Sequence, residues 1–174
     1  MKKIIILIFL MYIGVSSFAQ KSMQTEFDSL IGKGREYLSR GEIEDAIRIF
    51  TIAINKDSLR MEGFYGLGIS YFLKNDSLFN LAAINCFSKA IKIDSSYHKA
   101  YFNRGSCYAK SGNYQAALSD FDRAIKLSNT FGEYYYNRAY VNFKLGKKQQ
   151  GCNDLDEAKK YKFNFDEKLY ELCN

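Results

Sequence analysis

The chain contains a four-fold internal repeat, and this feature restricts its fold more than any other. Small residues recur as Gly34, Gly68, Gly105 and Ala139, at separations of 34, 37 and 34 residues. Three further series recur at separations of 37, 34 and 34 residues: Ala46, Ala83, Ala117 and Gly151; Ala53, Ala90, Ala124 and Ala158; Phe50, Phe87, Phe121 and Leu155. All four series agree on a period of 34 residues if the second unit contains three inserted residues between Gly68 and Ala83. A period of about 20 to 50 residues is typical of a solenoid, in which each unit packs only on its neighbours.

Each repeat unit is predicted to be a pair of helices. In the third unit Tyr101, Gly105 and Tyr108 are spaced i, i+4 and i+7, which places them on one helix face. The chain has no proline, a residue that the turns of sandwiches and barrels normally use, and this also favours helices. The predicted breaks between the paired helices are Gly41-Glu42, Gly112-Asn113 and Gly146-Lys147.

The residues at these positions resemble the tetratricopeptide repeat (TPR) family. The second unit shows the family pattern as Phe64, Leu67, Gly68, Tyr71, Ala83, Phe87 and Ala90, and the third as Tyr101, Gly105, Tyr108, Gly112, Ala117, Phe121 and Ala124. The resemblance implies an all-α, right-handed superhelix of four helix-turn-helix repeats. They are expected at about 27–60, 61–97, 98–131 and 132–165.

The two ends of the chain are predicted to lie outside the repeats. Residues 1–19 contain two lysines, an apolar core and small residues at the end, the pattern of a secretory signal peptide cleaved between Ala19 and Gln20. The apolar stretch is shorter than the ~18 residues of a spanning helix, so an uncleaved membrane anchor is the less favoured alternative. Residues 20–26 are a lead-in, and residues 166–174 are expected to cap the last repeat. We therefore expect an exported protein, either periplasmic or secreted.

The composition and motifs disfavour several classes of function. The net charge is +6, and it falls to a mild +4 without Lys2 and Lys3 of the expected signal peptide; no dense block of Lys and Arg indicates nucleic-acid binding. The single histidine, His98, fits a solvated residue better than a general base. The chain has no phosphate-binding glycine loop, HExxH or G-x-S-x-G motif. We expect no catalysis, no cofactor, no metal and no small-molecule substrate.

Arginine and aspartate occur together in the last two repeats. Arg104 and Arg138 lie on the first helices of these repeats, and Asp120 and Asp154 lie on the second helices. The first two repeats lack both the arginine and the acid. This joint occurrence predicts a structural salt bridge within each of the two repeats. The alternative is that both arginines bind an anionic ligand.

The four cysteines lack the CxxC spacing of a zinc or redox motif. In an exported protein Cys152, on the last repeat, and Cys173, on the cap, are a candidate disulfide. Cys86 and Cys107 are a weaker candidate pair. Buried free thiols are the favoured interpretation for all four.

The concave surface of the superhelix is the candidate binding site. In the TPR family it is lined by positions 5, 9, 12 and 13 of the first helices, so the resemblance assigns to it Ile31, Arg35, Leu38, Tyr65, Ile69, Phe72, Leu73, Phe102, Ser106, Ala109, Lys110, Tyr136, Tyr140, Phe143 and Lys144. An apolar strip of this extent usually marks a binding surface, unless curvature or residues 20–25 cover part of it. Replacing Phe102 and Tyr136 with alanine should then remove binding without loss of stability.

These residues predict a protein-interaction module of the cell envelope. The aromatic side chains would anchor an extended or helical peptide, and the lysines would favour acidic flanking residues. The carboxylate clamp of the family is not expected, because the corresponding positions hold few cations: Ile31, Arg35, Gly66, Lys99 and Asn103. The alternative is a structural subunit that is permanently buried in an envelope complex or homo-oligomer.

Overall fold

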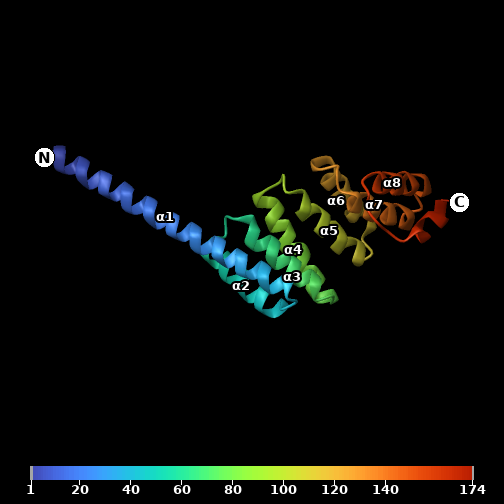
Figure 1. Ribbon diagram of the computed structural model, residues 1–174, viewed down its shortest axis with the longest axis horizontal. Helices are drawn as coiled ribbons and strands as arrows, with labels where there is room; N and C mark the ends of the chain where they lie inside the picture. Colours follow the sequence, from blue (N-terminus) through green and yellow to red (C-terminus); the bar gives the residue numbers. More distant parts are fainter. Residues whose placement is uncertain (1, 174) are drawn as a thin grey trace.

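The computed structural model describes residues 2–173, with side chains from residue 20 onward except that of Glu167. Within this range the chain forms eight α-helices, one 3-10 helix and no strand. The elements are α1 (Lys2–Ser39), α2 (Ile43–Lys56), α3 (Met61–Leu73), α4 (Ser77–Ile93), α5 (His98–Lys110), α6 (Tyr114–Leu127), α7 (Gly132–Lys144), α8 (Lys148–Lys160) and η1 (Glu167–Cys173). Consecutive helices pack as pairs that follow one another along the molecule (Figure 1). The predicted all-α array of stacked helix pairs is confirmed.

Each pair is closed by a three-residue turn whose middle residue has a positive φ. Gly41, Gly112 and Gly146 have φ angles of 76°, 77° and 72°, a left-handed conformation that glycine adopts without steric cost. Asn75 takes this position in the second pair with a φ of 56°. All four turns are therefore equally short. The three inserted residues lengthen α4 instead, which spans 17 residues against 14 in α2 and in α6.

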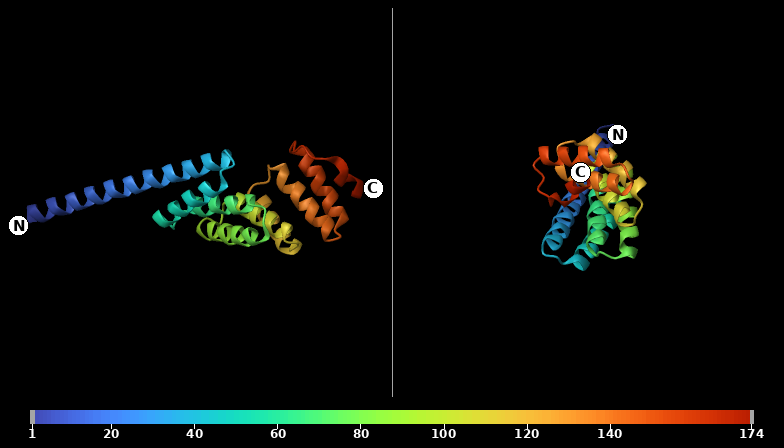
Figure 2. Two further views of the ribbon diagram at one scale, coloured as in Figure 1. Left: turned by 90° about the horizontal axis from the view of Figure 1, so that it is seen from below. Right: turned by 90° about the vertical axis from the view of Figure 1, so that its right-hand side faces the viewer.

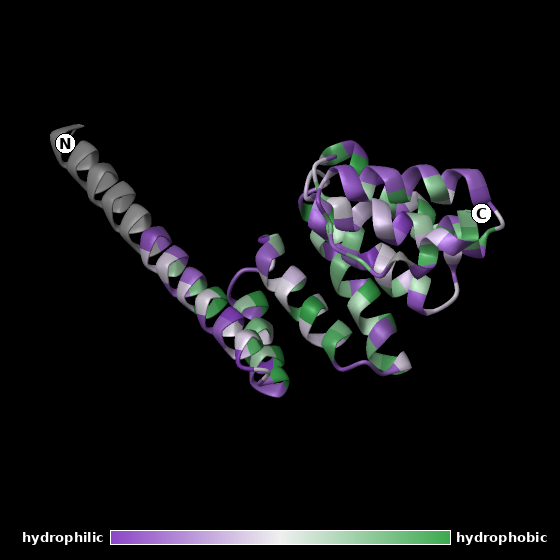
Figure 3. Ribbon diagram, turned by 45° about the vertical axis from the view of Figure 1, so that its right-hand side comes forward, coloured by the Kyte–Doolittle hydropathy of each residue, from purple (hydrophilic) through white to green (hydrophobic). Residues whose placement is uncertain are grey.

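The core lies between the helices and is built around buried phenylalanines that face glycines. Phe50 and Phe87 are almost fully buried. A Cβ atom added to Gly34 would lie 2.6 Å from the Phe50 ring, and one added to Gly68 would lie 2.6 Å from the Phe87 ring. Only glycine leaves room for these rings, so the repeated small residues set how closely the helices approach. Figure 3 shows hydrophobic residues interspersed with hydrophilic ones along the helices, as expected for helices buried on one side.

Helix α1 extends well beyond the array. Its N-terminal part projects away from the stacked pairs, far from α5 and α7 (Figures 1 and 2). Residues 20–26 are all exposed, and Phe27 is the first buried residue of the described core. The lead-in is therefore a helical continuation of α1. The expected signal peptide, residues 1–19, lies outside the residues whose side chains are described. Among the described residues, none of the helices is long and apolar enough to cross a bilayer.

The chain after α8 packs onto the last pair. The rings of Phe163 and Phe165 lie 5.4 and 5.0 Å from that of Tyr136 on α7. Asp166 then accepts a backbone hydrogen bond at the start of η1. The expected capping helix is thus a 3-10 helix, and its Leu172 is 49% exposed. The apolar cover comes mainly from the two phenylalanines that precede it.

Candidate functional site

The first helices α3, α5 and α7 lie side by side and form a groove. The groove contains two adjoining hollows of about 350 Å³ each. Both are lined by Phe102, Asn103 and Glu133, so together they make one continuous trough. The other lining residues are Tyr65, Ile69, Lys99, Phe131 and Tyr134 in the first hollow, and Phe72, Ser106, Ala109, Lys110, Asn137 and Tyr140 in the second.

Aromatic rings form much of the groove wall. The ring of Tyr134 stacks on Phe102 at 4.5 Å and on Phe131 at 5.0 Å, measured between centroids. The hydroxyl of Tyr65 accepts a hydrogen bond of 2.9 Å from the Asn103 amide. Burial raises the pKa of both Tyr65 and Tyr134 well above the usual range, so the two hydroxyls stay neutral. The wall is therefore uncharged and held in place by its own contacts.

Charged side chains surround this wall. The ammonium groups of Lys110 and Lys144 lie 5.6 and 5.4 Å above the rings of Phe72 and Tyr140, within cation–π range. Lys99 lines the first hollow. The groove thus combines aromatic surface with polar side chains, among them Asn103 and Glu133, and has cationic groups at its edges, an arrangement suited to an amphipathic chain segment.

Most of the predicted groove residues line these hollows: Tyr65, Ile69, Phe72, Phe102, Ser106, Ala109, Lys110 and Tyr140. The other seven do not, and for three of these, Ile31, Phe143 and Tyr136, the prediction of a groove position is wrong. Ile31 is 5% exposed and belongs to the core around Phe50. Phe143 fills the space beside Gly151, where a Cβ would lie 2.8 Å from its ring. Tyr136 is covered by the segment that follows α8.

The remaining predicted residues lie towards the ends of the groove. Arg35 borders a separate hollow of about 270 Å³ between α1 and α3. Leu38 is half-buried against the N-terminal core. Leu73 and Lys144 are exposed at the ends of their helices.

The groove is also lined by four residues that the sequence did not predict there: Phe131, Glu133, Tyr134 and Asn137. The family positions used for the assignment leave them out. A helical spacing could have found two of them, because Glu133, Asn137 and Tyr140 follow the i, i+4, i+7 rule of a single face.

Both arginines form ion pairs within their repeats. Arg104 donates to the two carboxylate oxygens of Asp120 at 2.8 Å each. Arg138 donates to those of Asp154 at 3.0 and 2.6 Å. The bond from Asp120 contributes most to raising the pKa of the Arg104 guanidinium. The structure therefore places the four residues as the predicted structural pairs, outside the groove.

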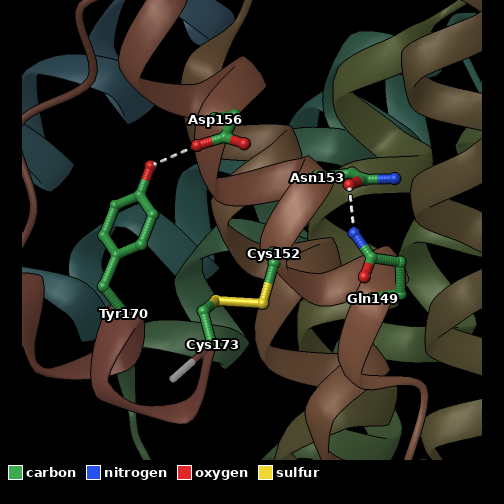
Figure 4. The surroundings of a disulfide bond; sticks show 6 residues. All are labelled: Gln149, Cys152, Asn153, Asp156, Tyr170 and Cys173. Carbon is green, nitrogen blue, oxygen red and sulfur yellow. Dashed lines mark hydrogen bonds between the residues drawn. A yellow bond between two sulfur atoms is a disulfide. The ribbon is translucent and has the colours of Figure 1, made fainter.

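Cys152 and Cys173 are joined in a disulfide that ties α8 to η1 (Figure 4). Nearby, the Tyr170 hydroxyl donates a 2.8 Å hydrogen bond to Asp156 (Figure 4). The favoured interpretation of four free thiols is therefore wrong for this pair, because the last turn of the chain brings Cys173 back onto α8.

Cys86 and Cys107 are free and buried, so the weaker candidate pair is not formed. Burial raises the pKa of Cys86 to about 11 and that of Cys107 to about 12. Thiols with pKa values this high carry almost no thiolate at neutral pH and are poor nucleophiles.

His98 is half-buried, whereas a solvated side chain was expected. Its Nδ1 lies 2.7 Å from the Tyr134 hydroxyl, and its ring centroid lies 5.2 Å from that of Phe131. Burial, followed by the charge of Lys99, lowers its pKa. His98 therefore supports the aromatic wall. Among the described residues, no group of three or more His, Cys, Asp or Glu could hold a metal ion.

Comparison with known proteins identifies one matching family model, Tetratricopeptide repeat, at residues 98–131. The solved structures that share the fold include the following three. MamA from Desulfovibrio magneticus RS-1 aligns with a TM-score of 0.70 and 18% identity over 78% of this chain and 75% of that one. PilF from Pseudomonas aeruginosa aligns with a TM-score of 0.74 and 18% identity, over 87% of this chain and 68% of PilF. The first TPR domain of Spaghetti (RPAP3), bound to the HSP90 peptide SRMEEVD, aligns with a TM-score of 0.65 and 22% identity. The alignment covers 69% of this chain and 93% of that domain.

Proposed function

Because the chain is a tetratricopeptide repeat protein, we propose that it is a non-catalytic interaction module whose groove along α3, α5 and α7 holds a segment of a partner protein. The observation that carries this proposal is the continuous trough with its preformed aromatic wall. Rings that already stack on one another lose little conformational freedom on binding, which favours affinity. The Spaghetti domain, which shares the fold, is bound to a peptide, and this supports the same class of ligand.

The proposed ligand is a peptide segment with apolar anchors and acidic flanks. Two hollows of about 350 Å³ offer room for separate side chains. Lys99, Lys110 and Lys144 around them would attract acidic residues of the ligand and increase its association rate.

A displayed library of random peptides tests groove binding directly. Peptides recovered by the purified protein would be measured by fluorescence anisotropy against the wild type and Tyr140→Ala. Tyr140 lines the groove and is 40% exposed, so its truncation should weaken binding about tenfold with little change in Tm. Leu78→Ala, at a site 74% exposed on α4, is the matched control and should retain full affinity. Failure to recover peptides, or equal effects of the two variants, would contradict the proposal.

The double variant of Phe102 and Tyr136 is not a suitable test. The ring centroid of Phe102 lies 5.7 Å from that of the fully buried Phe121, and Phe102 also stacks on Tyr134. Tyr136 is covered by the ring of Phe163. Truncating both rings would open cavities, so loss of binding would accompany loss of stability. The expectation that these residues are free of structural roles is corrected accordingly.

We also propose that the protein is exported to the cell envelope, either periplasmic or secreted, after cleavage between Ala19 and Gln20. The charged, apolar and small-residue regions of residues 1–19 support this. N-terminal sequencing of the protein recovered outside the cytoplasm should begin at Gln20, and a chain that still begins at Met1 would contradict cleavage. The purified protein should also be a monomer, since an obligate oligomer would favour the structural-subunit alternative.

A further inference from the structure

Glu133 is an acidic residue of the groove. The acids at the same position of the first two repeats share a cationic partner, and Glu133 has none among the described side chains. Three repeats carry an acid at their second residue, namely Asp28, Glu62 and Glu133, and the third repeat has Lys99 there. Arg60 donates to Asp28 at 2.9 Å and to Glu62 at 2.8 Å. Among the side chains that the structure describes, none forms an ion pair or hydrogen bond with the Glu133 carboxylate.

Arg60 shows how this fold holds a cation at that position. Its guanidinium bridges the two carboxylates and lies 4.2 Å above the ring of Phe27. Arg60 directly precedes α3, and the residue in the same place before α7 is Phe131. The fourth repeat therefore keeps the carboxylate and supplies an aromatic ring, but it does not supply the cation.

Glu133 also lies at the centre of the groove. It borders both hollows, together with Phe102 and Asn103. Its carboxylate reaches solvent, yet the neighbouring side chains remove enough water to raise its pKa by burial. Lys99 and Lys110 line the two hollows without forming an ion pair with it. An incompletely hydrated carboxylate in a groove that aromatic side chains also line is a favourable site for a ligand cation.

We propose that Glu133 recognises a basic residue of the bound segment. The ligand is a peptide in which an arginine or lysine, flanked by apolar residues, places its cation between the Glu133 carboxylate and the rings of Phe131 and Tyr134. The apolar neighbours enter the two hollows, and acidic residues farther along the segment face the lysines at the groove edges. This inference rests on the proposed function of the groove. It adds that the centre of the groove selects a positively charged residue of the peptide.

The competing role of Glu133 is purely structural. It lies in the first turn of α7, where a carboxylate stabilises the helix by opposing its dipole. That role would change the melting temperature of a variant slightly and would leave peptide selectivity unaltered. Selectivity is therefore the decisive readout.

The test uses the same random-peptide library with the wild type, Glu133→Gln and Glu133→Lys. Peptides selected by the wild type should share a basic residue between apolar ones. For one such peptide, Glu133→Gln should weaken binding about tenfold, the size expected when a charged hydrogen bond is lost. Replacing the basic residue of the peptide with leucine should have a similar effect, and the two losses should not add. Glu133→Lys should select acidic residues at that position. Glu171→Gln, an exposed acid on η1, is the matched control and should bind as the wild type does.

The outcomes separate this inference from the proposed function. If the wild type selects no peptide, or Tyr140→Ala leaves the affinity unchanged, the groove is not the site and both proposals fail. If Tyr140→Ala weakens binding but the selected peptides carry no basic residue, only the role of Glu133 is overturned. The same holds if Glu133→Gln binds within twofold of the wild type. Should Glu133→Gln fail to fold, the leucine-substituted peptide with the wild type still decides the question.

Discussion

Arg104 and Asp120 face each other from the two helices of the third repeat and are joined by two parallel hydrogen bonds of 2.8 Å. The remaining Nη1 of Arg104 donates to Ser88 on α4 at 2.9 Å, so one guanidinium connects three helices of two repeats. The Asp120 side chain is 8% exposed and that of Arg104 is 19% exposed. The pair therefore lies largely out of water, where removing one partner costs more than the pair itself contributes.

Asp120→Ala should lower the free energy of unfolding by about 2 kcal/mol. The cost is below that of a fully buried pair, because Arg104 keeps some contact with water after losing its partner. Replacing both residues together, as Arg104→Met with Asp120→Leu, should cost less than the single change, since no charge is left unpaired. Urea unfolding of the two variants measures the difference. A double variant that is less stable than the single one would show that the ion pair itself is stabilising.

The repeat array could be predicted from the sequence because its contacts are local and periodic. Phe50 and Gly34 belong to one helix pair, and the same contact recurs a repeat later as Phe87 and Gly68. The ion pairs were predictable for the same reason, since Arg104 and Asp120 occur together in one repeat and are absent together from others. Each of these features follows from neighbouring segments of the chain, so no knowledge of the distant fold was needed.

The ends of the groove could not be predicted in this way. Ile31 and Tyr136 occupy the same repeat position as Phe102, yet the first is in the core and the second lies under Phe163. The position is the same but the neighbours differ, because the end repeats have a repeat on one side only. Glu133 was missed because its importance depends on a missing partner, which a pattern of similar residues does not reveal.

Two glycines of α1 should respond oppositely to the same substitution. A Cβ at Gly32 would meet no atom within 4 Å, so Gly32→Ala should stabilise the protein by about 0.5–1 kcal/mol through better helix propensity. A Cβ at Gly34 would lie 2.6 Å from the ring of Phe50, which is buried and cannot move aside. Gly34→Ala should therefore destabilise by about 1–3 kcal/mol. Thermal melting of the two variants tests both predictions. Changes in Tm of the same sign would contradict the close packing of Phe50 against Gly34.

The disulfide between Cys152 and Cys173 should hold the last turn of the chain on α8. The two cysteines are 21 residues apart, and a closed loop of this length can stabilise a protein by up to about 3 kcal/mol. Reduction should lower Tm and make residues after α8 sensitive to limited proteolysis, because Phe163 and Phe165 are then held by packing alone. Cys152→Ala with Cys173→Ala should behave like the reduced wild type and should not respond to reductant. If reduction leaves both proteolysis and Tm unchanged, the bond has no role in holding this segment.

His98 should make the protein less stable as the pH falls from 7 to 5. Burial lowers its pKa in the folded state, so the unfolded chain, with a pKa of about 6.5, takes up the proton first. The contribution of neutral His98 is therefore present above about pH 6.5 and is lost as the pH falls through the folded-state pKa. Carboxylates that titrate in the same range remain in His98→Gln, so the difference between the two proteins isolates the histidine. Urea midpoints at pH 7, 6 and 5 should fall less steeply for His98→Gln than for the wild type. If the urea midpoints of the two proteins fall equally with pH, the contact between His98 Nδ1 and the Tyr134 hydroxyl does not depend on a neutral histidine ring.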